Sequence, residues 1–314
     1  MELLFDYRER EAVLERFGID LEIYTQTLIF LEDVNEKNVY SYFNERFDIV
    51  SKYLSTIRRV DSQPCSSLFY YFSECQKAFV GKRRSADSDD KRNMALIKTF
   101  LCSAYNYICY LVAEATFNPR RKTVVVFEAC PRDLPAIQSR REARKIKQQA
   151  KFYRVNCVLS FGTNINTFKF LCDKYRIDYM HFVSHGEGNG DLALVGNNGF
   201  CKLLTYKTFE AYFKDNYDSS VHPKTVLCCY FNSCYSNIFI NKMCASSSMM
   251  RVFKHRIGHI GVNDDDLAIF SAVAFYNCAF RTNDVIYSFL QSVERVRIYR
   301  YYYGGPYANE MLLR

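Results

Sequence analysis

Prolines and glycines are scarce in this chain, with 6 and 12 among 314 residues, while hydrophobic residues make up 49%. This composition argues against a disordered protein and predicts a packed globular fold. No run approaches about eighteen consecutive apolar residues, so no membrane span is expected. The first residues also lack the basic-then-apolar pattern of a secretory signal, which favours a cytoplasmic location.

No Cys-x-x-Cys pair occurs, although the chain has 13 cysteines. The odd number and irregular spacings are not those of a disulfide framework. Several of these residues, such as Cys102, Cys157 and Cys278, lie in apolar runs, where a thiol behaves as a small hydrophobic group. We therefore expect neither a zinc site nor a cofactor.

Positive charge is concentrated in one segment. The net charge is +8, and residues 120–154 contain eleven Lys and Arg against three acidic residues, so this segment carries the whole excess. Within Ser139–Lys151, Ala143, Ile146 and Ala150 keep helical spacing, which predicts an amphipathic helix with a solvated charged face. The sequence leaves open whether this face also docks an acidic partner or a nucleic acid.

The apolar pattern divides the chain near residue 118. Residues 1–118 predict a helical regulatory or recruiting domain, because apolar and aromatic residues recur at three- and four-residue spacing. The polar stretch Arg83–Lys91 predicts a loop within it. The helices are expected at Leu21–Leu31, Val39–Ile57, Ser67–Phe79 and Met94–Phe117.

Residues 119–314 show a different pattern, in which short β-branched runs alternate with helical stretches. This alternation predicts an α/β fold with a mostly parallel sheet flanked by helices. The strands are expected at Thr123–Phe127, Asn156–Phe161, Asp178–Ser184, Thr225–Phe231, His255–Val262 and Arg297–Tyr303. The helices between and after them are expected at Ser139–Lys151, Ile165–Tyr175, Leu203–Asn216, Leu267–Phe280 and Val285–Val293.

Two of the expected strands end beside chemically active side chains, His185 and Cys234. In an open parallel sheet, functional groups gather at the carboxyl ends of the strands. A cysteine attacks as the thiolate, and a nearby imidazole takes its proton and later returns it to the leaving group. The sequence therefore predicts a cysteine nucleophile, Cys234, with His185 as its general base.

The backbone beyond these strand ends offers donors for an oxyanion. The N–H groups of Gly186 and Cys234 are the candidates, because neither needs a partner in the sheet. His181 shares a strand face with His185 and is expected in the core or in support of the site. Cys228 and Cys229 lie in mid-strand, where burial is expected instead of reactivity.

The same residues resemble a known family. Tyr179-Met-His-Phe-Val-Ser-His-Gly186 and Val226-Leu-Cys-Cys-Tyr-Phe-Asn-Ser-Cys-Tyr-Ser236 are similar to the two signature blocks of CHAT domains, caspase-like peptidases related to separase, gingipains and clostripain. The likeness spans about residues 121–308 and ends near Tyr303-Gly-Gly-Pro306. It implies a caspase-like sandwich in which the dyad works without a dominant third member; Glu187 is a weak candidate to orient His185.

The resemblance also implies a substrate pocket. Metacaspases place an aspartate two residues before the nucleophile, where this chain has Asn232. Separase instead binds a basic residue with an aspartate from an acidic turn after the next strand, and Asn263-Asp-Asp-Asp-Leu267 is similar to that turn. Asp264 or Asp266 is thus expected to hold Arg or Lys. Aspartates here also suit the N-terminus of a helix, and the two roles can coexist.

Two classes of function follow. The first is a regulated endopeptidase that makes limited cuts at a specific site of a protein substrate and has an activating protein or ligand partner; the resemblance implies a setting in prokaryotic defence or cell death. The alternative is a catalytically idle caspase-like scaffold that binds partners through its helical domain and basic helix. A nucleic-acid partner stays open, and binding that falls steeply with salt would reveal one.

Overall fold

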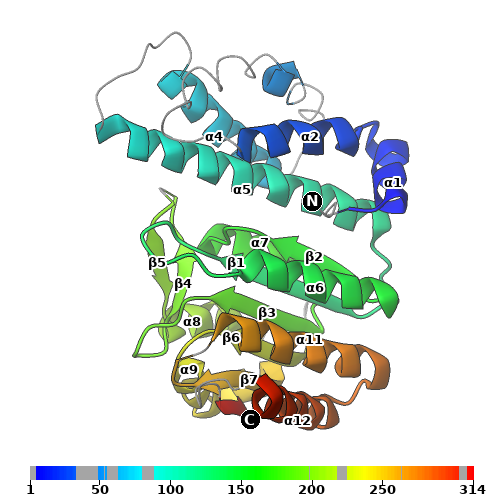
Figure 1. Ribbon diagram of the computed structural model, residues 1–314, viewed down its shortest axis with the longest axis vertical. Helices are drawn as coiled ribbons and strands as arrows, with labels where there is room; N and C mark the ends of the chain where they lie inside the picture. Colours follow the sequence, from blue (N-terminus) through cyan, green and yellow to red (C-terminus); the bar gives the residue numbers. More distant parts are fainter. Residues whose placement is uncertain are drawn as a thin grey trace. The chain divides into compact units, whose positions relative to one another are not determined.

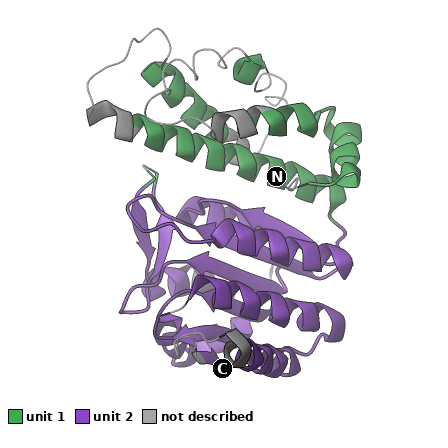
Figure 2. Cartoon of the chain, viewed as in Figure 1, with its two compact units in different colours: residues 1–117, 197–199 green, residues 118–196, 200–314 purple. Residues whose placement is uncertain are grey.

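The computed structural model describes residues 5–32, 49–52, 54, 63–79, 88–197, 199–217, 225–262, 264–303 and 310–314 (Figure 1). Contacts divide the chain into two compact units (Figure 2). The first unit comprises Met1–Phe117 with Asn197–Gly199, and the second comprises Asn118–Gly196 with Phe200–Arg314.

The elements described in Met1–Phe117 are all helices. They are α1 (Tyr7–Phe17), α2 (Leu21–Glu32), α4 (Gln63–Phe79) and α5 (Ser88–Thr116). The first helix begins at a capping box, in which Asp6 and Glu9 each accept the other's backbone N–H, and it ends at Gly18 in the left-handed region. Most of the expected helix Val39–Ile57 lies outside the described residues.

Helix α5 departs from the expected pattern in two ways. It begins at Ser88, so the end of the polar stretch Arg83–Lys91 is helical and is not a loop; residues 83–87 lie outside the described part. Within α5, Asn93–Thr116 is also long and apolar enough, by length and composition alone, to cross a membrane, although it contains no uninterrupted run of about eighteen apolar residues. Because 61% of its most apolar window is buried, the helix has the burial of a core helix.

The second unit contains a six-stranded sheet in the order β2-β1-β3-β6-β7-β8. The strands are β1 (Thr123–Ala129), β2 (Asn156–Ser160), β3 (Tyr179–Ser184), β6 (Val226–Asn232), β7 (Phe253–Ile260) and β8 (Glu310–Leu313). All pairings are parallel except that of β7 with β8. The prediction of a mostly parallel sheet flanked by helices is confirmed.

Helices cover both faces of this sheet. On one face lie α6 (Ser139–Phe152), α11 (Asp265–Thr282) and α12 (Val285–Tyr303), with α6 and α11 side by side in Figure 1. The other face is covered by α7 (Ile165–Lys174), α8 (Tyr206–Tyr217) and α9 (Ser236–Cys244), and the short α10 (Ser247–Val252) leads into β7.

Aromatic rings form the core beneath α7, α8 and α9. Phe127, Phe182 and Phe231 from three neighbouring strands stack with centroids 5.1 and 5.2 Å apart. Phe168 and Phe209 from the covering helices pack against this row. Each buried ring contributes about 1.5–3 kcal/mol relative to an exposed one, and this row holds β1, β3 and β6 in one layer.

Two expected elements are wrong. Arg297–Tyr303 is not a strand but the end of α12: Val296 is buried, and the ring centre of Tyr299 lies 5.0 Å from that of Phe270. The tyrosines of this segment have strand propensity, but packing against α11 decides for a helix. The start of the expected helix Leu203–Asn216 is instead β5 (Cys201–Leu204). This strand pairs with β4 (Leu192–Val195) as a hairpin, and α8 begins only at Tyr206.

Candidate active site

His185 and Cys234 leave the sheet at the same level. Strands β3 and β6 are parallel neighbours, and Val183 pairs with Asn232. His185 and Cys234 each follow their paired residue by two positions, so the register brings both to the carboxyl edge of the sheet together. Both side chains are partly exposed, as a nucleophile and its base require.

Gly186 brings the histidine loop against the nucleophile. A Cβ atom at this position would lie 1.9 Å from the carbonyl oxygen of Cys234 and 3.1 Å from its nitrogen. The two backbones are therefore so close that a side chain cannot fit between them. The sequence pattern His-Gly at this strand end has a direct steric reason.

The Nε2 atom of His185 lies 2.8 Å from the carbonyl oxygen of Pro135. A carbonyl can only accept a hydrogen bond, so Nε2 carries the proton and donates it. The neutral imidazole then presents Nδ1 as its basic atom, which fits a general base. Glu187 is exposed, and its backbone N–H bonds to the Asp191 carbonyl. The imidazole of His185 binds the Pro135 carbonyl and not the Glu187 carboxylate.

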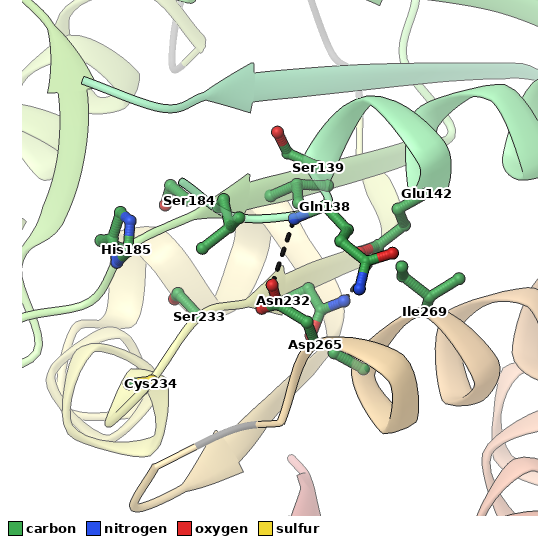
Figure 3. Close-up of a pocket in the computed structure, with 13 residues that line it drawn as sticks. Gln138, Ser139, Glu142, Ser184, His185, Asn232, Ser233, Cys234, Asp265 and Ile269 are labelled. Atoms are coloured by element: carbon green, nitrogen blue, oxygen red, sulfur yellow. Dashed lines mark hydrogen bonds between the residues drawn. The ribbon is translucent and has the colours of Figure 1, made fainter. Parts of the chain in front are cut away.

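A pocket of about 150 Å³ opens beside this pair (Figure 3). Figure 3 shows His185, Ser233 and Cys234 at one end of it, with Glu142 and Ile269 at the other. Its wall comes from the loop before α6, from α6, from the ends of β3 and β6 and from the start of α11. The lining residues are Ile137, Gln138, Ser139, Glu142, Val183, Ser184, His185, Asn232, Ser233, Cys234, Asp265, Ala268 and Ile269.

The three aspartates of the acidic turn have three different roles. Asp264 caps α11, its side chain accepting the N–H of Leu267 at 3.1 Å. Asp266 is exposed and pairs with Arg141 at 2.9 Å. Asp265 lines the pocket and accepts the backbone N–H of Gln138 at 3.1 Å. Of the three aspartates, Asp265 is the one that lines this pocket, and a substrate contact of Asp264 or Asp266 stays a prediction.

Asn232 lines the pocket, and its side-chain amide is hydrogen-bonded to Glu142. Its Nδ2 donates to Oε1 of Glu142 at 2.6 Å, and Nε2 of His181 donates to the same oxygen at 2.7 Å. All three side chains are buried. Nδ1 of His181 is buried without a hydrogen-bond partner in the described structure.

Two hydroxyl groups in the pocket wall are unusual. Ser184 and Ser233 are 4% and 2% exposed, and neither Oγ has a hydrogen-bond partner among the described residues. A buried hydroxyl without a partner costs about 1–3 kcal/mol, so both are suited to bind a group that enters the pocket.

The backbone around Gly186 fits the expected oxyanion site. Gly186 forms an isolated bridge with Leu192, but the hydrogen bonds of this bridge run from Ala193 to His185 and from Glu187 to Asp191. The N–H of Gly186 therefore takes no part in them. The Gly186 residue lies against the backbone of Cys234, which carries the second expected donor.

The other cysteines of β6 are placed as expected. Cys228 and Cys229 are fully buried, and burial raises the pKa of each thiol well above its ordinary value, which suppresses the reactive thiolate. Among the described residues, no group of three or more His, Cys, Asp and Glu side chains could hold a metal ion.

Comparison of the chain with models of known protein families gives no match, and no curated protein matches it in sequence. The site therefore has to be interpreted from its own geometry.

Proposed function

We propose that the second unit is a caspase-like cysteine endopeptidase, with Cys234 as nucleophile and His185 as general base. The observation that carries the proposal is the meeting of the two strand ends: the register of β3 with β6 and the contact of Gly186 with the Cys234 backbone bring imidazole and thiol to one pocket. Limited, regulated cleavage of a protein in a defence or cell-death pathway is the setting that the CHAT resemblance suggests.

The steps follow from the positions of the groups. Nδ1 of His185 takes the proton of Cys234, and the thiolate attacks the carbonyl carbon of the scissile peptide. The N–H groups of Gly186 and Cys234 receive the negative charge that develops on the carbonyl oxygen. The imidazolium then protonates the leaving amine, and water deprotonated by the same imidazole hydrolyses the thioester.

The pocket chemistry favours a basic side chain before the cleaved bond. Asp265 and Glu142 supply two carboxylates to the wall, and the wall includes neither Lys nor Arg. The hydroxyls of Ser184 and Ser233 add two further acceptors. A guanidinium group, with five N–H donors, satisfies such a set of acceptors better than an ammonium group does, so Arg is the favoured residue and Lys the second.

The test is cleavage of a peptide library by the wild-type protein, Cys234→Ala and His185→Ala. We expect cleavage after basic residues by the wild type and none by Cys234→Ala. As a second readout, an iodoacetamide probe should label Cys234 faster than the buried Cys228. Equal cleavage by Cys234→Ala, or labelling of Cys234 no faster than of the other thiols, would overturn the proposal and favour the idle scaffold.

A further inference from the structure

The loop between β1 and α6 carries the carbonyl that holds the catalytic imidazole. Pro135 lies in this loop, and its oxygen accepts the proton of His185 Nε2 at 2.8 Å. A single carbonyl of an irregular segment can fix a histidine only if the segment is itself held in place. What holds this loop is therefore part of the site.

Two hydrogen bonds anchor the loop on either side of Pro135. On the carboxyl side, the N–H of Gln138 bonds to Asp265 at 3.1 Å. On the amino side, Oδ1 of Asp133 accepts the backbone N–H of Cys201 at 2.7 Å. Cys201 is the first residue of β5, so the second anchor ties the loop to the β4–β5 hairpin.

The hairpin is a suitable support because it is already fixed to the catalytic histidine. The N–H of Ala193 in β4 donates to the carbonyl of His185 at 3.0 Å. The hairpin thus contacts His185 through its backbone and contacts the loop through Asp133. The Arg132 guanidinium, 5.4 Å from the ring centre of Phe200, is a second contact between loop and hairpin.

We propose that Asp133 is a positioning residue for His185: by holding the N–H of Cys201, it keeps the Pro135 carbonyl against Nε2 and so keeps the imidazole in the tautomer whose Nδ1 is unprotonated. The bond is charge-assisted and short, which makes it stronger than a neutral one. The effect on turnover rests on the proposed peptidase function, but the effect on the imidazole does not.

The central comparison is Asp133→Ala with Asp133→Asn. Alanine removes the acceptor, whereas asparagine keeps an oxygen of the same reach. We expect Asp133→Ala to lower kcat about tenfold with KM changed less than about twofold, by analogy with residues that orient metal-binding histidines. Asp133→Asn should stay within about threefold of the wild type.

A matched control is Asp178→Ala. Asp178 also accepts one backbone N–H, that of Thr123 at 2.9 Å, but at the amino end of β1 and thus away from the site. This variant should lower the melting temperature without a selective loss of kcat. Equal losses of kcat in Asp133→Ala and Asp178→Ala would reduce Asp133 to a structural residue and overturn the proposal.

A second variant removes the donor in place of the acceptor. Proline is tolerated at the first residue of a strand, so Cys201→Pro can be used to delete the N–H that Asp133 binds. It should show the loss seen in Asp133→Ala, and the double variant should lose no more than either single one. Additive losses would mean that the two residues do not act through this bond.

The direct readout is the ¹⁵N NMR spectrum of histidine-labelled protein, with His185→Gln used to identify the His185 signals. The wild type should show a protonated Nε2 and an unprotonated Nδ1, and Asp133→Ala should shift both signals toward an average of the two tautomers. Unchanged signals would refute the proposal. If the wild type cleaves nothing, or Cys234→Ala cleaves equally, the peptidase function fails while this comparison still decides the role of Asp133.

Discussion

Replacement of Gly186 by alanine tests the contact on which the proposed catalytic pair depends. The added Cβ would lie 1.9 Å from the Cys234 oxygen and 2.9 Å from its carbonyl carbon. Both are backbone atoms, so the contact cannot be relieved by rotation of a flexible side chain. To reach an ordinary separation of about 3.4 Å, the ends of β3 and β6 must move apart by roughly 1.5 Å.

This displacement separates the nucleophile from its base. A misplacement of about 1 Å in an active site can cost about a hundredfold in rate, so kcat/KM of Gly186→Ala should fall at least that far. Overpacking of a close contact costs about 1–3 kcal/mol, so the variant should remain folded with a lowered melting temperature. The rate of Cys234 alkylation should fall as well, because the imidazole no longer draws off its proton.

Gly188→Ala is the matched control, since a Cβ at Gly188 would have no atom within 4 Å. Peptide cleavage, alkylation and thermal melting should be measured on both variants in parallel. If Gly186→Ala keeps activity and alkylation within about threefold of Gly188→Ala, then the close approach of the two backbones does not serve catalysis, and the reasoning from it is refuted.

Three further predictions concern the pocket and its surroundings. Asp265→Asn should lower kcat/KM for Arg and Lys substrates about tenfold or more, whereas Asp266→Asn should leave it unchanged. Peptide kinetics measure both, and equal effects would exclude Asp265 as the residue that binds the basic side chain of the substrate. Burial lowers the pKa of His259 to about 3, so the unfolded chain binds a proton below about pH 6.5 that the folded one does not. Its contribution to stability is complete above pH 6.5 and is lost as pH falls toward 3, and the loss amounts to about 2 kcal/mol by pH 5. Urea unfolding should therefore show a smaller difference in the free energy of unfolding between pH 7 and pH 5 in His259→Leu than in the wild type. An identical difference in the two proteins would contradict this assignment. Asn232→Asp would put a second buried carboxylate at the 2.6 Å contact with Glu142. Because the two carboxylates repel each other when both are charged, the melting temperature should fall more at pH 7 than at pH 5. A fall that does not depend on pH would argue against this repulsion.

The sequence indicated the sheet and the meeting of His185 with Cys234 for a physical reason. Buried parallel strands require nearly continuous apolar runs, and such runs are visible in a sequence at Tyr179–Ser184 and Val226–Phe231. Whatever follows such runs must emerge at one edge of a parallel sheet. Chain order and strand ends were thus enough to choose His185 and Cys234 among five histidines and thirteen cysteines.

The hairpin β4–β5 was missed because its signal is weak. Both strands have only four residues, and most of β5 is exposed or half-exposed, so neither a long apolar run nor a clear alternation marks it. Its role in holding the loop around Pro135 depends on a contact between residues far apart in the chain.

The sequence by itself determined the parallel strands of the sheet and which two reactive side chains end neighbouring strands, because both follow from local apolar patterns and from chain order. Tertiary structure alone decided the rest of the site. Which of Asp264, Asp265 and Asp266 enters the pocket depends on the rotation of α11 about its axis, since successive helical residues point about 100° apart. The partner of His185 is a backbone carbonyl, a group that every residue carries, so only the packed fold could single out Pro135.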